Sequence, residues 1–206
     1  MSIESPNLFE AQTFKTTQSV TAGFVKNDAS GNLLYGQAGS AWDLIEKKDI
    51  VTPTGSITFS GLNGDVDEVY MLLFRNLSPA GGSSPAIVDL RPNAIANVGF
   101  TTLYNMAGTG VTTIFTASTQ LQIQRVSTSA LTPVFGKFIF YAKTGQRRML
   151  QGLSSESRAA TNDFNGKYWT GRWQDETTNI TSIELIANAS DRISAGSSWQ
   201  LYRAVN

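Results

Sequence analysis

The chain has 206 residues, sixteen of them basic and sixteen acidic, so its formal net charge is zero. This balance, with a charged fraction of 16% against the roughly 25% of an average soluble domain, argues against nucleic acids and anionic membranes as partners. The absence of cysteine and histidine removes disulfides, zinc-thiolate sites, thiol nucleophiles and every imidazole-based catalytic arrangement.

The first residues, Met1 to Pro6, carry neither the basic region nor the apolar core of a signal peptide. No stretch of the chain approaches about 18 consecutive apolar residues. We therefore expect a protein that is made and used without membrane insertion. We also predict that it has no catalytic residue, no bound metal and no cofactor.

Ser, Thr, Asn, Gln and Gly separate short runs of Val, Ile, Phe, Tyr and Leu along most of the chain. This pattern is typical of an all-β protein with many turns, and helical periodicity is almost missing. Eight to ten short strands at this spacing predict an antiparallel β-sandwich that is jelly-roll-like. We expect it to form a head domain over residues 51–206, after an N-terminal arm over residues 1–50.

The arm is polar, and its apolar residues are spread too thinly to bury one another. Residues 22–36 predict a small hairpin, because two strand-like runs flank a turn that contains Asp28 and Gly31. An isolated two-stranded hairpin is marginal in water, so the arm must pack on the head, on copies of itself or on another protein. A disordered leader is the alternative. The apolar residues that we expect to dock are Leu8, Phe9, Phe14, Val20, Phe24, Leu33 and Tyr35.

Residues 41–51 favour a strand that leads into the head. The run 69–76 is the most continuously apolar and predicts a central strand buried on both faces. Residues 134–142 predict a second major strand. The last 27 residues, 180–206, predict two alternating strands joined by a Gly/Ser-rich turn as a closing hairpin. The residues expected to face the core there are Ile183, Leu185, Ala187, Trp199, Leu201 and Val205.

Two sites built on acidic residues have weak support. A glycosidase needs two facing carboxylates, and Asp163, Asp175 and Glu176 are close in sequence, but the adjacent pair 175–176 is typical of a solvated turn. A calcium ion needs several oxygen ligands, which Asp65, Asp67 and Glu68 carry. Their spacing matches no known calcium-binding loop.

A sugar-binding face is a further alternative, since sugar rings stack on Trp and Tyr while Arg bonds hydroxyl groups. The residues that would form such a platform are Tyr168, Trp169, Arg172, Trp173 and Tyr202. The competing interpretation is that Trp169, Trp173 and Trp199 belong to the core, because a Trp side chain buries a large area.

Two stretches resemble virion appendage proteins of tailed bacteriophages. Residues 20–36 resemble the leaders of phage fibres, with Asn27-Asp28-Ala29-Ser30-Gly31-Asn32 followed by Leu33-Leu34-Tyr35-Gly36. Residues 196–202, which run from Gly-Ser to Leu-Tyr, resemble the closing strand of their β-sandwich heads. Residues 57–65 and 90–93 fit the same pattern.

The resemblance implies a homotrimer with a jelly-roll-like head that points outward and an arm that docks on other virion proteins. We therefore interpret the chain as a non-enzymatic virion structural protein, assembled in the host cytoplasm. It would be a short tail fibre or a particle-surface appendage, with host-surface glycan as a further partner. Because the chain has no repetitive shaft, a capsid decoration protein that stabilises the head is the alternative.

Overall fold

The computed structural model describes residues 23–27, 33–37, 41–78, 86–96, 99–105, 112–117, 121–126, 132–158, 163–189 and 192–205. The chain divides into two compact units, residues 1–40 and residues 41–206. The predicted boundary at residue 50 is therefore wrong by ten residues. The reason is that Trp42–Asp49 forms a strand, β3, that pairs with the last strand of the chain and belongs to the head.

The first unit contains the predicted hairpin. Strands β1 (Gly23–Asn27) and β2 (Leu33–Gln37) pair antiparallel, from Gly23 opposite Gln37 to Asn27 opposite Leu33. Of the apolar arm residues, Phe24 lies on β1, and Leu33 and Tyr35 lie on β2. The other four, Leu8, Phe9, Phe14 and Val20, lie outside the described residues.

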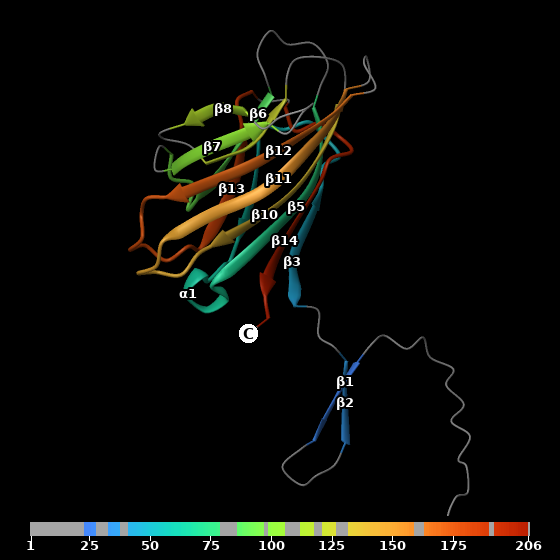
Figure 1. Cartoon of the computed structure of the whole chain (residues 1–206), viewed down its shortest axis with the longest axis vertical. Helices are drawn as coiled ribbons and strands as arrows, with labels where there is room; N and C mark the ends of the chain where they lie inside the picture. Colours follow the sequence, from blue (N-terminus) through green and yellow to red (C-terminus); the bar gives the residue numbers. More distant parts are fainter. Residues whose placement is uncertain are drawn as a thin grey trace, which may run out of the picture. The chain divides into compact units, whose positions relative to one another are not determined.

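Eight strands of the second unit form the predicted jelly roll (Figure 1). One group runs in the order β3-β14-β5-β10 and the other in the order β4-β13-β6-β9, which is the strand order of two interleaved Greek keys. The bounds of the strands other than β3 are β4 Ser56–Ser60, β5 Val69–Ser78, β6 Ala86–Pro92, β9 Leu121–Val126, β10 Thr132–Tyr141, β13 Ser182–Ala187 and β14 Ser198–Ala204.

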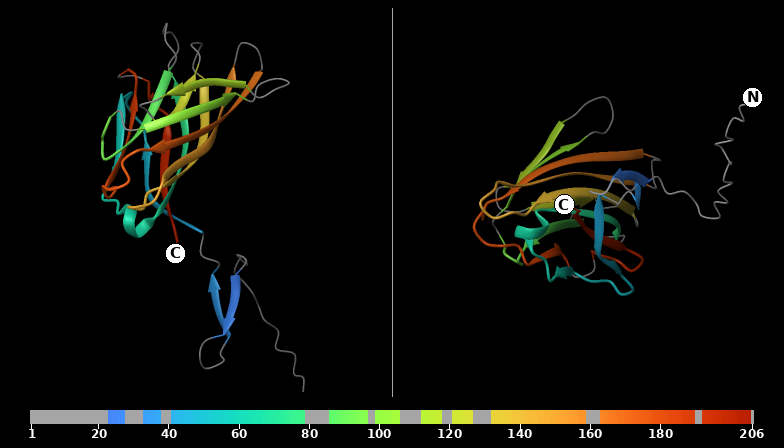
Figure 2. Two further views of the ribbon diagram at one scale, coloured as in Figure 1. Left: turned by 60° about the vertical axis from the view of Figure 1, so that its left-hand side comes forward. Right: turned by 90° about the horizontal axis from the view of Figure 1, so that it is seen from below.

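Four further strands widen one of the two sheets. β7 (Gly99–Asn105) and β8 (Thr112–Ala117) lie between β6 and β9 in the chain. β11 (Arg148–Arg158) and β12 (Asp163–Trp173) lie between β10 and β13. Together they extend the first sheet to eight strands, in the order β3-β14-β5-β10-β11-β12-β7-β8, over the four-stranded sheet (Figure 2).

The predicted closing hairpin is wrong. Its two strands form as expected, but β13 lies in the four-stranded sheet and β14 in the eight-stranded sheet. Stacked sheets are roughly 10 Å apart, a gap that the segment between β13 and β14 is long enough to cross. Ile183, Leu185, Trp199 and Leu201 are buried as predicted, whereas Val205 is 50% exposed because it lies beyond the end of β14.

A row of aromatic rings fills the space between the sheets. The Phe74 ring stacks on Trp199 at 4.3 Å between centroids and lies 6.1 Å from Phe138, which in turn lies 6.5 Å from Trp169. Trp169, Trp173 and Trp199 are all fully buried, so the interpretation of these three residues as core is confirmed.

Two glycines make room for this row. A Cβ atom at Gly136 would lie 2.3 Å from the Phe74 ring, and one at Gly152 would lie 2.6 Å from the Phe138 ring. Each glycine is the direct cross-strand partner of the phenylalanine that covers it. The rings therefore occupy the places where side chains of β10 and β11 would otherwise stand.

The two ends of the second unit meet at one end of the sandwich. Ala204 pairs with Trp42, and the backbone N–H of Val205 donates to the carbonyl of Ala41 at 3.1 Å. The one-turn helix α1 (Gly64–Asp67) precedes β5 at this end, which we call the proximal end (Figure 1). The opposite, distal end contains the last residue of β5 and the first of β10.

No helix among the described residues has the length and apolar character needed to cross a bilayer.

Replacing Gly152 by Ala should lower the free energy of unfolding by about 2–3 kcal/mol, because the added methyl group meets the Lys137 carbonyl oxygen at 2.3 Å and neither the strand nor the Phe138 ring can yield without loss of packing. Urea denaturation measures the change. The exposed neighbour Gln151, replaced by Ala, is the control and should change stability by less than about 0.5 kcal/mol. Equal stability of the two variants would contradict this description of the core.

Candidate functional site

The outer face of the eight-stranded sheet exposes large apolar side chains. In β10 and β11, alternate residues such as Phe138 and Leu150 are buried against the four-stranded sheet. The residues between them face outward. The four most exposed are Phe135 at 52%, Leu153 at 51%, Tyr141 at 45% and Met149 at 43%. A soluble domain rarely gathers exposed apolar side chains on one surface without a partner for it.

The proximal half of this face is apolar across four adjacent strands. Leu44 on β3 lies opposite Tyr202, Tyr202 lies opposite Met71, and Met71 lies opposite Ile139 on β10. Tyr141 and Met149 lie one row closer to the proximal end. We call these six residues the proximal patch, in which Leu44, Tyr141 and Met149 are exposed while Met71 is buried.

A groove of about 600 Å³ crosses the distal half of the same face. One of its two rows follows paired residues on five adjacent strands, from β14 to β12. The residues of this row, in order, are Ser198, Arg75, Phe135, Ser155 and Gly166. Ser198, Ser155 and Gly166 are small. The surface is therefore hollow beside the two larger side chains of this row, Arg75 and Phe135.

The second row of the groove consists of Gln200, Leu73, Lys137 and Leu153 on β14, β5, β10 and β11. Both charged side chains of the groove are therefore basic, and none of its described lining residues is acidic. Arg75 donates from Nη2 to the carbonyl of Gly196 at 2.7 Å, which fixes its guanidinium beside the groove. The ammonium of Lys137 has no hydrogen bond or ion pair within the described part of the chain.

The predicted sugar-binding platform is wrong as a unit. Trp169 and Trp173 point inward, where Trp169 Nε1 donates to Ser154 Oγ at 2.8 Å. Tyr168 and Arg172 alternate with them and lie on the outer side of β12, while Tyr202 lies on β14, with β5, β10 and β11 in between. The two-residue period of a strand separates adjacent residues onto opposite faces, so one strand could not present all four aromatic and basic residues together.

Sequence reasoning missed the groove. Its residues come from strands far apart in the chain, and alternation alone does not say which face of a sheet is covered. The only sequence signal was the pattern Phe135-Gly136-Lys137 in a strand that is otherwise mostly apolar.

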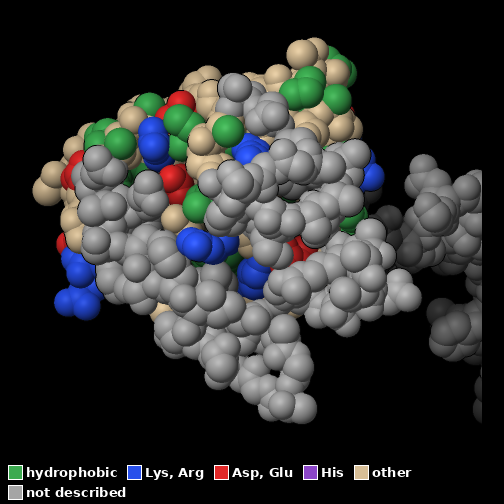
Figure 3. All heavy atoms as spheres, turned by 90° about the horizontal axis from the view of Figure 1, so that it is seen from above, with side chains coloured by type: hydrophobic (Ala, Val, Ile, Leu, Met, Phe, Trp, Pro, Cys, Tyr) green, Lys and Arg blue, Asp and Glu red, His purple; other side chains and the backbone are tan. Residues whose placement is uncertain are grey.

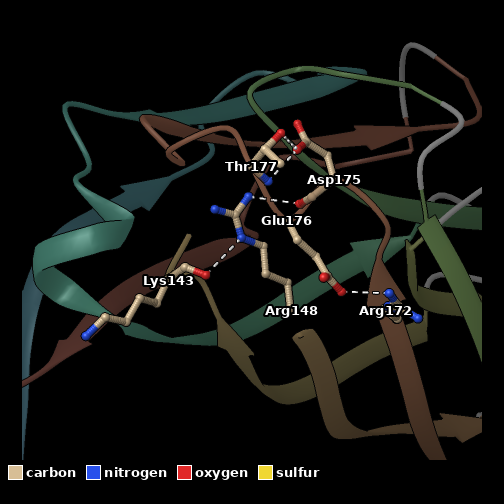
Figure 4. A network of polar contacts seen from close by, with 6 residues as sticks. All are labelled: Lys143, Arg148, Arg172, Asp175, Glu176 and Thr177. Carbon is tan, nitrogen blue, oxygen red and sulfur yellow. Dashed lines mark hydrogen bonds and ion pairs between the residues drawn. The ribbon is translucent and has the colours of Figure 1, made fainter. Parts of the chain in front are cut away.

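Arg148 is buried at the proximal end, where it joins two loops (Figure 4). Its guanidinium donates to the carbonyls of Thr178 at 2.6 Å and Asp175 at 3.0 Å, and its Nε donates to the carbonyl of Lys143 at 3.3 Å. The guanidinium also lies 4.8 Å from the centre of the Trp173 ring. Burial lowers the pKa of Arg148, and these acceptors stabilise its charge.

The carboxylates considered for a glycosidase are part of the same structure. Asp175 Oδ1 accepts from the backbone N–H of Thr177 at 2.8 Å and of Thr178 at 3.1 Å, and hydrogen bonds from Thr178 and Thr177 lower the pKa of Asp175 to about 2. Glu176 accepts from Arg172 at 2.6 Å. A glycosidase general acid needs a raised pKa, so Asp175 has the wrong environment for that role. The side chain of Asp163 lies outside the described residues.

The acidic residues considered for calcium each bind a different protein group. Asp65 Oδ1 accepts from the backbone N–H of Thr144 at 2.7 Å, and Asp67 Oδ2 accepts from the hydroxyl of Tyr70 at 2.7 Å. Glu68 forms an ion pair with Lys143. Within the described ranges no three acidic residues lie close enough to hold a metal ion together.

Buried polar groups tie the two sheets together. Asn76 on β5 donates to Gln124 on β9 at 3.0 Å and accepts from the hydroxyl of Ser197 at 2.9 Å. Lys167 forms an ion pair with Glu156 at 3.1 Å and also donates to the carbonyl of Arg125 on β9. These contacts stabilise the packing of β9 on the wider sheet.

The distal end carries mixed charge. In Figure 3, which views the molecule from the top of Figure 1, the described Lys and Arg side chains lie as separate groups with Asp and Glu among them. The described surface on this end has no continuous basic patch of the kind that nucleic acids bind.

Comparison with protein-family models, with curated proteins and with solved structures found no match to this chain.

Asp89 on β6 gives the fold a pH dependence that can be measured. Its carboxyl group is buried opposite Gln122, its Oδ1 has no hydrogen-bond partner among the described residues, and burial raises its pKa to about 6. Because the folded state favours the protonated carboxyl of Asp89, this group stabilises the fold fully below about pH 4. The contribution is lost as the pH rises through about 6. The variant Asp89→Asn should therefore be more stable than the natural chain at pH 7.5 and not at pH 4.

Thermal unfolding at both pH values measures the effect of Asp89→Asn. Asp175→Asn is the control, because its change in stability at pH 7.5 should have the opposite sign. The lowered pKa of Asp175 contributes stability above about pH 4 that is lost as the pH falls towards about 2, so this variant should be destabilised at pH 7.5. The same direction of change for both variants at pH 7.5 would contradict the environments described here.

Proposed function

We propose that the chain is a non-enzymatic structural protein of a tailed-phage virion, an appendage that its N-terminal residues anchor to the particle. The observation that carries this proposal is the separate first unit, whose described part is a single pair of five-residue strands. A two-stranded hairpin is too small to be independently stable, so it gains its stability from a partner surface. The resemblance of residues 20–36 to phage fibre leaders supports a virion protein as that partner.

The proximal patch supports self-association of the head. Leu44, Tyr202, Met71 and Ile139 form an unbroken apolar row over four strands, and the patch lies at the end of the head where β3 begins. We propose that three copies bring these patches together, which also places three anchoring segments on one assembly. Three linked contacts bind far more tightly than one, because the second and third form at a high effective concentration.

The appendage proposed is a short tail fibre or a surface fibre with host-surface glycan as its ligand. Capsid decoration is the alternative role for the same architecture. Antibodies against the chain are expected to label purified particles, and the position of the label distinguishes the tail from the head shell. Particles without label would contradict the proposal.

Deletion of residues 1–40 should leave a folded head, because residues 41–206 form a compact unit, and should abolish incorporation into particles. Mass spectrometry of purified particles together with thermal unfolding of the truncated protein measures both properties. The full-length variant Phe135→Ala, altered only in the groove, is the control and should be incorporated normally. Incorporation of the truncated protein would assign anchoring to another surface.

Met149→Lys should reduce the mass in solution from about three times 22.3 kDa to that of a single chain, because the interface would then bury an unpaired charge from every copy. Light scattering coupled to size exclusion measures the mass. Val66→Lys introduces the same charge at a residue that is 65% exposed and lies outside the patch, so it should leave the mass unchanged. Identical masses for the two variants would mean that the patch does not hold the copies together.

A further inference from the structure

The groove on the distal half of the outer face differs in chemistry from the proximal patch. It combines two cations, the large apolar side chains of Leu73, Phe135 and Leu153, the hydroxyl of Ser155 and the amide of Gln200, and none of its described lining residues is acidic. Its volume of about 600 Å³ is within the range of small-ligand sites, roughly 300–1,000 Å³. These properties indicate a ligand that is both anionic and rich in hydrogen-bonding groups.

The two cations are placed to act together. Arg75 lies directly opposite Phe135, and Lys137 is two residues further along the same strand, so Arg75 and Lys137 are diagonal neighbours on adjacent strands. Such positions are about 7–8 Å apart, a spacing that carboxylates on adjoining units of a chain molecule can bridge. Arg75 uses Nη2 for Gly196, and neither its other N–H groups nor the ammonium of Lys137 has a hydrogen-bond partner among the described residues.

The remaining lining fits a sugar ring. Phe135 is half exposed beside the small residues Ser155 and Gly166, so one side of its ring is open to the groove. The C–H face of a sugar can stack there, while the hydroxyl of Ser155 and the amide of Gln200 line the groove beside it and can bond its hydroxyl groups.

A peptide fits this groove less well. The groove runs across five paired strands, not along a free edge, so the backbone groups on its floor already bond to neighbouring strands. A peptide would therefore find no row of backbone partners, which is what gives strand-addition sites their affinity. A saccharide needs only side-chain partners.

We propose that the groove binds a saccharide whose sugar units carry carboxylates, with Arg75 and Lys137 pairing the carboxylates and Phe135 stacking on a ring. The site lies on the distal half of the sheet, in rows of residues next to those of the proximal patch. The inference rests on the proposed function in one respect, that the saccharide belongs to a host surface.

Calorimetric titration of the full-length protein with trigalacturonate tests this proposal. The fully methyl-esterified trisaccharide is the matched ligand control, since it keeps the rings and neutralises the carboxylates. We expect trigalacturonate to bind, its ester to bind at least about tenfold more weakly, and the affinity to fall as salt is raised from 50 to about 500 mM. Binding of both sugars with equal affinity, or of neither, would overturn the proposal.

Variants then locate the site. Arg75→Gln, Lys137→Gln and Phe135→Ala should each weaken trigalacturonate binding by about tenfold or more, and Phe135→Tyr should restore it. Arg147→Gln removes an exposed cation outside the groove and should bind like the natural chain. Unchanged thermal unfolding shows that each variant is folded. An equal loss of affinity in Arg147→Gln would mean that binding follows the overall charge of the protein. It would refute the groove as the binding site.

A tetraglutamate peptide provides the test against the other class of anionic ligand. Tighter binding of this peptide than of trigalacturonate would overturn the assignment to saccharides. The outcome is independent of the virion role, because the titration uses purified protein. A protein that binds trigalacturonate yet is absent from particles would refute the proposed function alone, and one that is found on particles yet binds no sugar would refute this inference alone.

Discussion

The packing of phenylalanine rings over glycines determines the arrangement of the whole head. Phe74 and Phe138 lie where Gly136 and Gly152 leave room, and no other residue fits at either glycine without displacing a ring. The rings join Trp199 and Trp169 in one buried row across the wide sheet. Because strand residues alternate between faces, this row also fixes which side chains of the wide sheet face outward. Phe135, Lys137 and Leu153 are exposed as a direct consequence, so the core chemistry sets the composition of the candidate binding face.

Charged and polar side chains have mainly structural roles in the described part of this molecule. Arg148 holds two loops by their carbonyl groups, Asp175 caps a turn, and Asn76 with Gln124 bridges the sheets. Each of these groups is bonded to other groups of the protein. Lys137 differs because its charge stands in a groove without any partner among the described residues. This contrast is why the groove is a better candidate for ligand binding than any of the acidic clusters.

The sequence predicted local structure well and spatial arrangement less well. Alternation in residues 182–187 and 198–204 correctly predicted two strands, and the strand count predicted a jelly roll. The closing hairpin failed because a Gly/Ser-rich connection can turn within one sheet or cross to another, and local pattern does not decide between them. Trp169 and Trp173 were recognised as ambiguous, since their exposure depends on whether a second sheet covers them. The groove depends on register between distant strands, which one sequence does not contain.

The position of β3 has a mechanical consequence. This strand begins at the proximal end and runs antiparallel to β14 through seven paired residues. A pull on residue 41 directed along β3 would load all of these backbone hydrogen bonds in shear at once. Bonds loaded together resist far more force than bonds opened one after another. Force in this direction would therefore meet the strongest resistance that this pair of strands can offer.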